Sequence, residues 1–76
     1  MHNELDTVVL ARDLKEHKLS RGDVGTVVHC YAGGQAYEVE FVTGEGRTIA
    51  VLTLEKTDIR PMQSQEILHV REFAAA

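Results

Sequence analysis

The sequence contains little cysteine, little proline and few aromatic residues. Among its 76 residues there are one cysteine, one proline, no tryptophan, two tyrosines and two phenylalanines. A lone cysteine cannot form an internal disulfide, so Cys30 indicates a reducing compartment such as the cytoplasm. A chain of this length forms one domain with a small core. Without disulfides, such a domain depends on close packing or on self-association.

Long apolar runs and an excess of basic residues are also missing. The most apolar stretches, 8–11 and 49–54, are far too short to span a bilayer. The N-terminus carries Glu4 and Asp6 and lacks the basic start of a secretory signal. The sequence has eight Lys or Arg and twelve Asp or Glu, and the resulting net charge of -4 disfavours a general affinity for nucleic acid. We therefore expect a soluble cytoplasmic protein.

No recognisable set of catalytic or metal-binding residues is present in the sequence. His29 and Cys30 are adjacent in a predicted strand, so their side chains point to opposite faces and cannot share a metal ion. Glu38 and Glu40 share a face, but it is the outer face of a strand and not a cleft. We expect no enzyme activity, no cofactor, no metal and no small-molecule substrate.

The residues that are present read as short strands separated by turns. Residues 36–42 alternate cleanly, with Tyr37, Val39 and Phe41 on one face. Further strands are predicted from β-branched and apolar residues; they span 5–12, 24–31 and 47–54. Glycine-containing turns join the later strands, which predicts antiparallel hairpins.

Two strands are apolar on both faces, at 8–11 and 49–54. A strand buries both faces when it bends across a barrel corner or lies in a dimer contact. We therefore predict an all-β fold, a small barrel of about five antiparallel strands over residues 1–62. Residues 58–61 are expected to form a short 3-10 turn that runs into an extended segment, because Pro61 blocks a regular helix.

Residues 63–76 are predicted to be a C-terminal extension. Residues 66–71 combine isoleucine and valine with polar residues, which favours an added strand, although a short helix fits the same pattern. The last residues, 74–76, are expected to fray.

The segment GDVGTVV, residues 22–28, resembles the start of the KOW motif of ribosomal and transcription-elongation proteins. It also resembles a corner of the SH3-like barrel in the nitrile hydratase β-subunit family. Gly22 allows a sharp turn, Asp23 can cap that turn by accepting backbone hydrogen bonds, and Gly25 allows close approach of a neighbouring strand. These are folding reasons, and they specify no ligand.

A longer resemblance covers ELDTVVL, RGDVGTVVHCY, AYEVEFV, GRTIAVLTL and DIRP, from Glu4 to Pro61. These segments resemble domain of unknown function 4926, a family of short bacterial proteins. The resemblance implies an SH3-like barrel and brings no catalytic residues. Members are often encoded beside small proteins suspected to be toxins. The resemblance therefore implies that this protein is a partner or a neutraliser of such a toxin.

The functional hypothesis is a non-catalytic protein-interaction module that binds a partner protein or a second copy of itself. The predicted partner-binding residues are Arg12, Lys15, His17, Lys18 and Arg21 in the loop after the first strand, together with Tyr31. Ile67, Leu68 and Val70 are predicted to serve self-association. The alternative function is KOW-like RNA binding through the same loop, which the shortage of aromatic side chains disfavours. The ordinary alternative for the loop is a solvated segment of mixed charge.

Overall fold

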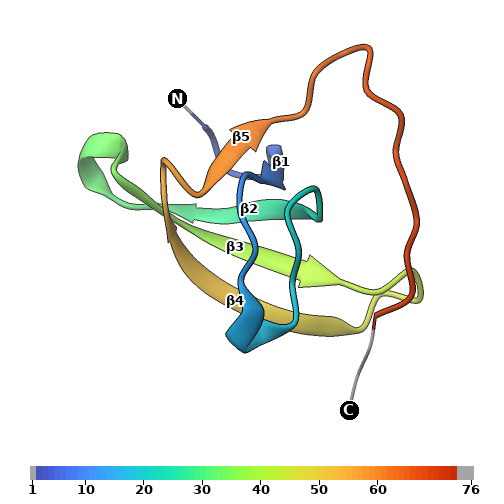
Figure 1. Cartoon of the computed structure of the whole chain (residues 1–76). Coiled ribbons are helices and arrows are strands. Elements are labelled where there is room, and N and C mark those ends of the chain that lie inside the picture. Colours follow the sequence, from blue (N-terminus) through green and yellow to red (C-terminus); the bar gives the residue numbers. More distant parts are fainter. Residues whose placement is uncertain (1, 74–76) are drawn as a thin grey trace.

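A computed structural model describes residues 2–73 of the chain. Its strands are β1 (Thr7–Leu10), β2 (Val24–Cys30), β3 (Ala36–Val42), β4 (Thr48–Glu55) and β5 (Ile59–Pro61). They form one antiparallel sheet in the order β4-β3-β2-β1-β5 (Figure 1). Among the described residues, the only helical segments are two 3-10 turns, η1 (Lys15–His17) and η2 (Ala32–Gly34). The predicted all-β fold of about five antiparallel strands is confirmed.

The core lies on the concave side of this curved sheet. Tyr37, Val39 and Phe41 on β3 are all buried, as their alternation predicts. The sheet curls until Leu54 of β4 and Ile59 of β5 pack into the same cluster. The two strands do not pair, however, so the hydrogen-bonded sheet stays open between β4 and β5. The result is a barrel-like domain that is closed between β4 and β5 by packed side chains and not by backbone hydrogen bonds.

The strands that are apolar on both faces differ in how fully they are buried. Val8, Val9 and Leu10 are all buried because β1 lies between β2 and β5. On β4, Leu54 is buried, but Val51 faces outward and remains 48% exposed. Burial of both faces therefore holds for β1 and only in part for β4, because β4 is an edge strand.

The corner at residues 20–25 has the geometry that its sequence predicts. Gly22 has a φ of 95°, which favours glycine, and the Ser20 amide donates to Asp23 Oδ2 at 2.8 Å. A Cβ on Gly25 would lie 2.6 Å from Val39 Cγ1 and 2.8 Å from Phe41 Cε1. The glycine therefore lets β2 approach the β3 side chains closely.

Of two predictions near the C-terminus, the tight turn lies three residues earlier than expected and does run into an extended segment, whereas the added strand or helix is wrong. The tight turn covers Glu55–Asp58, where the Asp58 amide donates to the Glu55 carbonyl at 2.9 Å, and residues 59–61 form β5. Residues 62–73 form neither the expected strand nor a helix. Pro61 ends β5, and the chain then turns over Gln63–Glu66 and arches away from the sheet edge (Figure 1). The predicted fraying of 74–76 lies outside the described residues.

Candidate functional site

The loop between β1 and β2 holds most of the predicted partner-binding residues. Leu14 and Leu19 exchange backbone hydrogen bonds of 2.9 and 3.1 Å, and both side chains are buried in the core. Between them the chain must loop outward, and η1 places Lys15 and His17 on the surface. Lys18 closes this loop in the left-handed conformation, with a φ of 60°. We call residues 15–18 the loop tip.

Arg12 has a structural partner. Its Nε donates to Asp58 Oδ1 at 2.7 Å, and the Glu55 amide donates to Asp58 Oδ2 at 2.9 Å. Burial raises the pKa of Asp58, but the Arg12 hydrogen bond, the Glu55 amide and the Arg12 charge outweigh burial, so the pKa lies below its ordinary value. This carboxylate ties the end of β1 to the turn before β5, and Arg12 is therefore less available to a partner than predicted.

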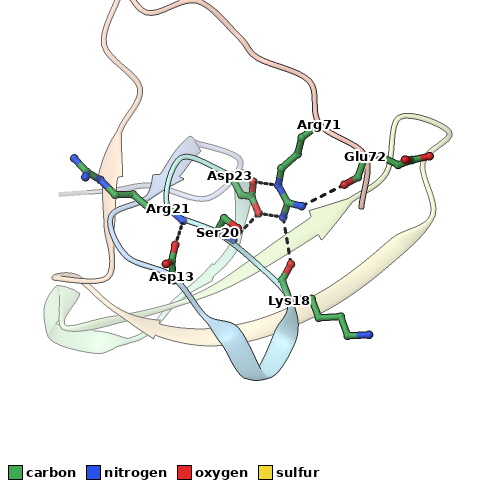
Figure 2. A network of polar contacts seen from close by, with 7 residues as sticks. All are labelled: Asp13, Lys18, Ser20, Arg21, Asp23, Arg71 and Glu72. Atoms are coloured by element: carbon green, nitrogen blue, oxygen red, sulfur yellow. Dashed lines mark hydrogen bonds and ion pairs between the residues drawn. The ribbon is translucent and has the colours of Figure 1, made fainter. Parts of the chain in front are cut away.

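Lys18 and Arg21 carry exposed side chains beside a polar network. The Arg21 amide donates to Asp13 Oδ1 at 2.8 Å, which uses its backbone and leaves its guanidinium in solvent. Figure 2 shows the side chains of Lys18 and Arg21 pointing away from the network. Both are thus available for contact with a partner.

Tyr31 does not belong to the same surface as Arg21. It follows β2, whereas Arg21 precedes it, and seven residues of strand span about 20 Å. Tyr31 is 42% exposed and packs edge-on against His29, with ring centroids 4.8 Å apart. The predicted set of partner-binding residues is therefore divided between the two ends of the sheet.

The tail, residues 62–73, is anchored near its start by an ion pair. Arg60 donates to both carboxylate oxygens of Glu66, at 2.8 and 2.7 Å, and the Gln63 amide adds a bond of 2.6 Å to the same carboxylate. The Arg60 hydrogen bond, followed by that of the Gln63 amide, lowers the pKa of Glu66 to about 2. This geometry fixes the direction in which the tail leaves β5.

A second anchor holds the end of the tail against the β1–β2 loop. Arg71 Nε donates to Asp23 Oδ1 at 2.8 Å, and its Nη2 donates to Asp23 Oδ2 and to the Lys18 carbonyl, the latter at 3.2 Å (Figure 2). Burial raises the pKa of Asp23, but the hydrogen bonds from Arg71 and Ser20 and the Arg71 charge together lower it below its ordinary value. Phe73 then packs against the core.

Between the two anchors, three apolar side chains extend into solvent. Ile67 is 92% exposed, Val70 is 89% exposed and Leu68 is 67% exposed. We call these three residues the tail ridge. They are the residues predicted for self-association, and the Arg71 contacts place them next to the β1–β2 loop. The structure therefore joins two sets that the sequence treats separately.

Two shallow grooves adjoin the tail. One, of about 370 Å³, lies between the tail and the start of β2, with Leu68, Val70 and Asp23 in its walls. The other, of about 410 Å³, is lined by the loop-tip residue His17, by Arg47 and by the start of β4. Phe73 lines both grooves.

Residues 2–73 bring together no group of three or more His, Cys, Asp or Glu side chains that could hold a metal ion. They also include no helix of the length and apolar character that a membrane crossing requires.

These features define a small all-β domain of barrel-like architecture. Its C-terminal tail is attached by two ion pairs, one to β5 and one to the start of β2. The chain belongs to the family described as a domain of unknown function (DUF4926), whose profile matches residues 4–61. A search of the curated proteins and a search of the solved structures each gave no match. The matched range covers the loop tip and all five strands, whereas the tail ridge lies beyond it.

Sequence reasoning missed the groups that organise this surface. Arg71 and Asp23 are 48 positions apart, so no local spacing in the sequence predicts their contact. Asp58 was expected in a turn, but its burial beside Arg12 gave no signal in the sequence. The one available clue was Asp23 in the GDVGTVV corner, because a turn-capping carboxylate has a second oxygen free to accept from a side chain.

Proposed function

We propose that this protein is a non-catalytic interaction module that binds a partner protein through the tail ridge, with the loop tip beside it. The observation that supports this most is the exposure of Ile67 and Val70 between two bidentate ion pairs. Large apolar side chains in water are unfavourable, and an anchored apolar strip is typical of an interaction site.

Anchoring matters because it reduces the cost of binding. A free tail would lose conformational entropy when it docked, whereas a tail held at Glu66 and Arg71 has lost much of that freedom already. The ridge is thus held between two fixed points, where a partner can contact it without ordering it first.

The chemistry of the surface indicates the partner. Lys15, Lys18 and Arg21 form no ion pair among residues 2–73, and they lie on the loop to which Arg71 fastens the tail. A partner with an apolar centre and acidic groups around it complements this arrangement. Given the family resemblance, the first candidate is a toxin-like protein encoded by a neighbouring gene, which this module would bind or neutralise.

Co-expression with the product of the neighbouring gene tests the proposal. The double variant Ile67→Ser/Val70→Ser should reduce recovery of the complex at least tenfold, because it removes the apolar centre of the contact. Val28→Ser is the matched control: Val28 is 40% exposed on β2, away from the tail, and its replacement should leave recovery unchanged.

The competing function is KOW-like RNA binding, and the same preparation distinguishes it. If RNA is retained at low salt and released when Lys15, Lys18 and Arg21 are neutralised, the protein-interaction proposal is wrong. Equal recovery of the partner with the ridge variant and with the wild type would also contradict it.

A further inference from the structure

The two grooves beside the tail differ in what lines them. We call the groove of about 370 Å³ between the tail and the start of β2 the tail groove. We call the groove of about 410 Å³ with His17 and Arg47 in its wall the Arg47 groove. Phe73 lines both, so the two grooves adjoin across its side chain. Each has the volume of an ordinary ligand-binding site.

The tail groove is apolar on both of its sides. Val24 and Val42 line it from the sheet, Leu68 and Val70 line it from the tail, and all four side chains are exposed. The one carboxylate in its wall is already held in the ion pair with Arg71. An apolar group that enters this groove would remove four apolar side chains from water at once, which favours an apolar occupant.

The Arg47 groove favours an anion beside that apolar group. No Asp or Glu lines it, and among residues 2–73 the side chains of Arg47 and His17 form no ion pair and no hydrogen bond. The Arg47 amide donates to Thr43 Oγ1 at 3.1 Å, which fixes the backbone of the arginine at the end of the β3–β4 turn. A carboxylate is the protein group that complements an unpaired guanidinium.

We propose that the partner presents an extended segment with an apolar side chain in the tail groove and an acidic side chain, two residues away, in the Arg47 groove. Alternate side chains of an extended chain point to the same side and lie about 7 Å apart, so the pair can straddle Phe73. This inference rests on the proposed function and specifies its partner, because Val70 belongs both to the tail ridge and to the wall of the tail groove.

Titration of the full chain with short peptides, followed by amide chemical shifts, tests the proposal. The probe is a five-residue peptide with leucine second, glutamate fourth and serine elsewhere, together with its reversed sequence. One of the two should shift amides around both grooves and saturate at about millimolar concentration, because few atoms make the contact. Replacing its glutamate by glutamine should weaken binding about fivefold, and replacing its leucine by serine about tenfold.

Variants of the protein assign each half of the probe to its groove. Arg47→Gln should weaken the glutamate peptide about fivefold and leave the glutamine peptide unchanged. Lys56→Gln is the matched control, because Lys56 is an exposed cation that lines neither groove. Val42→Ser should weaken both peptides, whereas Val51→Ser, at a similarly exposed valine outside the grooves, should weaken neither.

Three results would overturn the proposal. The first is equal binding of the glutamate and glutamine peptides, and the second is an equal effect of Arg47→Gln and Lys56→Gln. The third is a set of shifts around the grooves that grows with protein concentration alone, which would place a second copy of the chain there.

Failure of this inference differs from failure of the proposed function. If no peptide binds, yet the neighbouring gene product is recovered and lost with Ile67→Ser/Val70→Ser, the grooves are not the contact and the proposed function stands. If the peptides bind as expected but the ridge variant recovers that product as well as the wild type does, the grooves stand and the tail ridge is not the contact.

Discussion

At the scale of single residues, Gly25 is the tightest point of the fold. A methyl group there would lie 2.6 Å from Val39 Cγ1 and 3.1 Å from the Glu40 carbonyl oxygen, and neither can withdraw without moving β3. We therefore predict that Gly25→Ala lowers the free energy of unfolding by about 1–3 kcal/mol, measured by urea denaturation.

Gly44→Ala is the control for that variant. Gly44 lies in the β3–β4 turn, and a Cβ there would meet no atom within 4 Å. Its replacement should be neutral or slightly stabilising, because alanine restricts the unfolded chain more than glycine does. Equal destabilisation by the two variants would show that the loss at Gly25 comes from glycine flexibility and not from crowding.

Asp58 is a second single residue whose effect on stability can be predicted, and this effect depends on pH. Its pKa in the folded state lies below the ordinary value, so it contributes stability that is present above about pH 4 and lost as pH falls through the lowered pKa. Asp58→Asn should cost about 1–2 kcal/mol at pH 7, because the Arg12 bond loses its charged acceptor.

The difference between Asp58→Asn and the wild type should shrink as pH falls through the lowered pKa of Asp58, since the wild-type carboxylate then takes up a proton. Urea denaturation at pH 7, 4 and 2.5 measures it. Glu45→Gln, in an exposed turn, should follow the wild type at every pH. A constant difference between Asp58→Asn and the wild type would mean that the carboxyl contributes by shape and not by charge.

At the scale of elements, the tail is held by contacts at its two ends and has no ladder of its own. Arg71→Ala removes the end contact with Asp23 and the Lys18 carbonyl. We predict faster proteolysis over residues 67–71, with amide exchange in the strands unaffected, because the hydrogen bonds of the strands do not involve the tail.

Asp23→Ala separates the two roles of that carboxylate. It releases Arg71 and also removes the bond from the Ser20 amide, which shapes the turn into β2. Amide exchange should therefore rise in β2, and proteolysis should be faster in the tail. If Arg71→Ala alone loosens β2, the tail supports the sheet and is not merely anchored to it.

The strands and the tail also show what a sequence can predict. The alternation of β3 is a local signal, and Tyr37, Val39 and Phe41 are buried as it requires. Residues 66–71 also combine isoleucine and valine with polar residues, yet they pair with neither edge of the sheet, so the pattern produced a wrong prediction. Local periodicity reports what a segment could pair, whereas pairing depends on partners far along the chain.

The candidate site was predicted as two separate groups for the same reason. Lys18, Arg21 and Ile67 are exposed in the structure, as a role in contact with a partner requires. Their proximity depends on Arg71 reaching Asp23, and Arg12 is drawn away by Asp58. Ion pairs between distant positions leave no spacing in the sequence, so neither pairing could be read from it.

At the scale of the whole molecule, the small core is supplemented from outside the sheet. Phe73 packs against the cluster that the strands enclose, although the family match ends at residue 61. A domain of this size buries a modest fraction of its surface, so one partly buried aromatic side chain is a significant addition.

A chain ending at residue 62 should therefore fold but be less stable. All five strands lie within it, including Pro61 of β5, so its circular dichroism and amide dispersion should match those of the full chain. Its free energy of unfolding should fall by about 1 kcal/mol, roughly half the value of a fully buried phenylalanine. Phe73→Ala in the full chain should account for most of that loss, because the arginine of each anchoring ion pair is more than a third exposed and the pair therefore adds little stability. An unfolded truncated chain would mean instead that the tail is part of the folding unit, and that the domain extends beyond the range shared with its family.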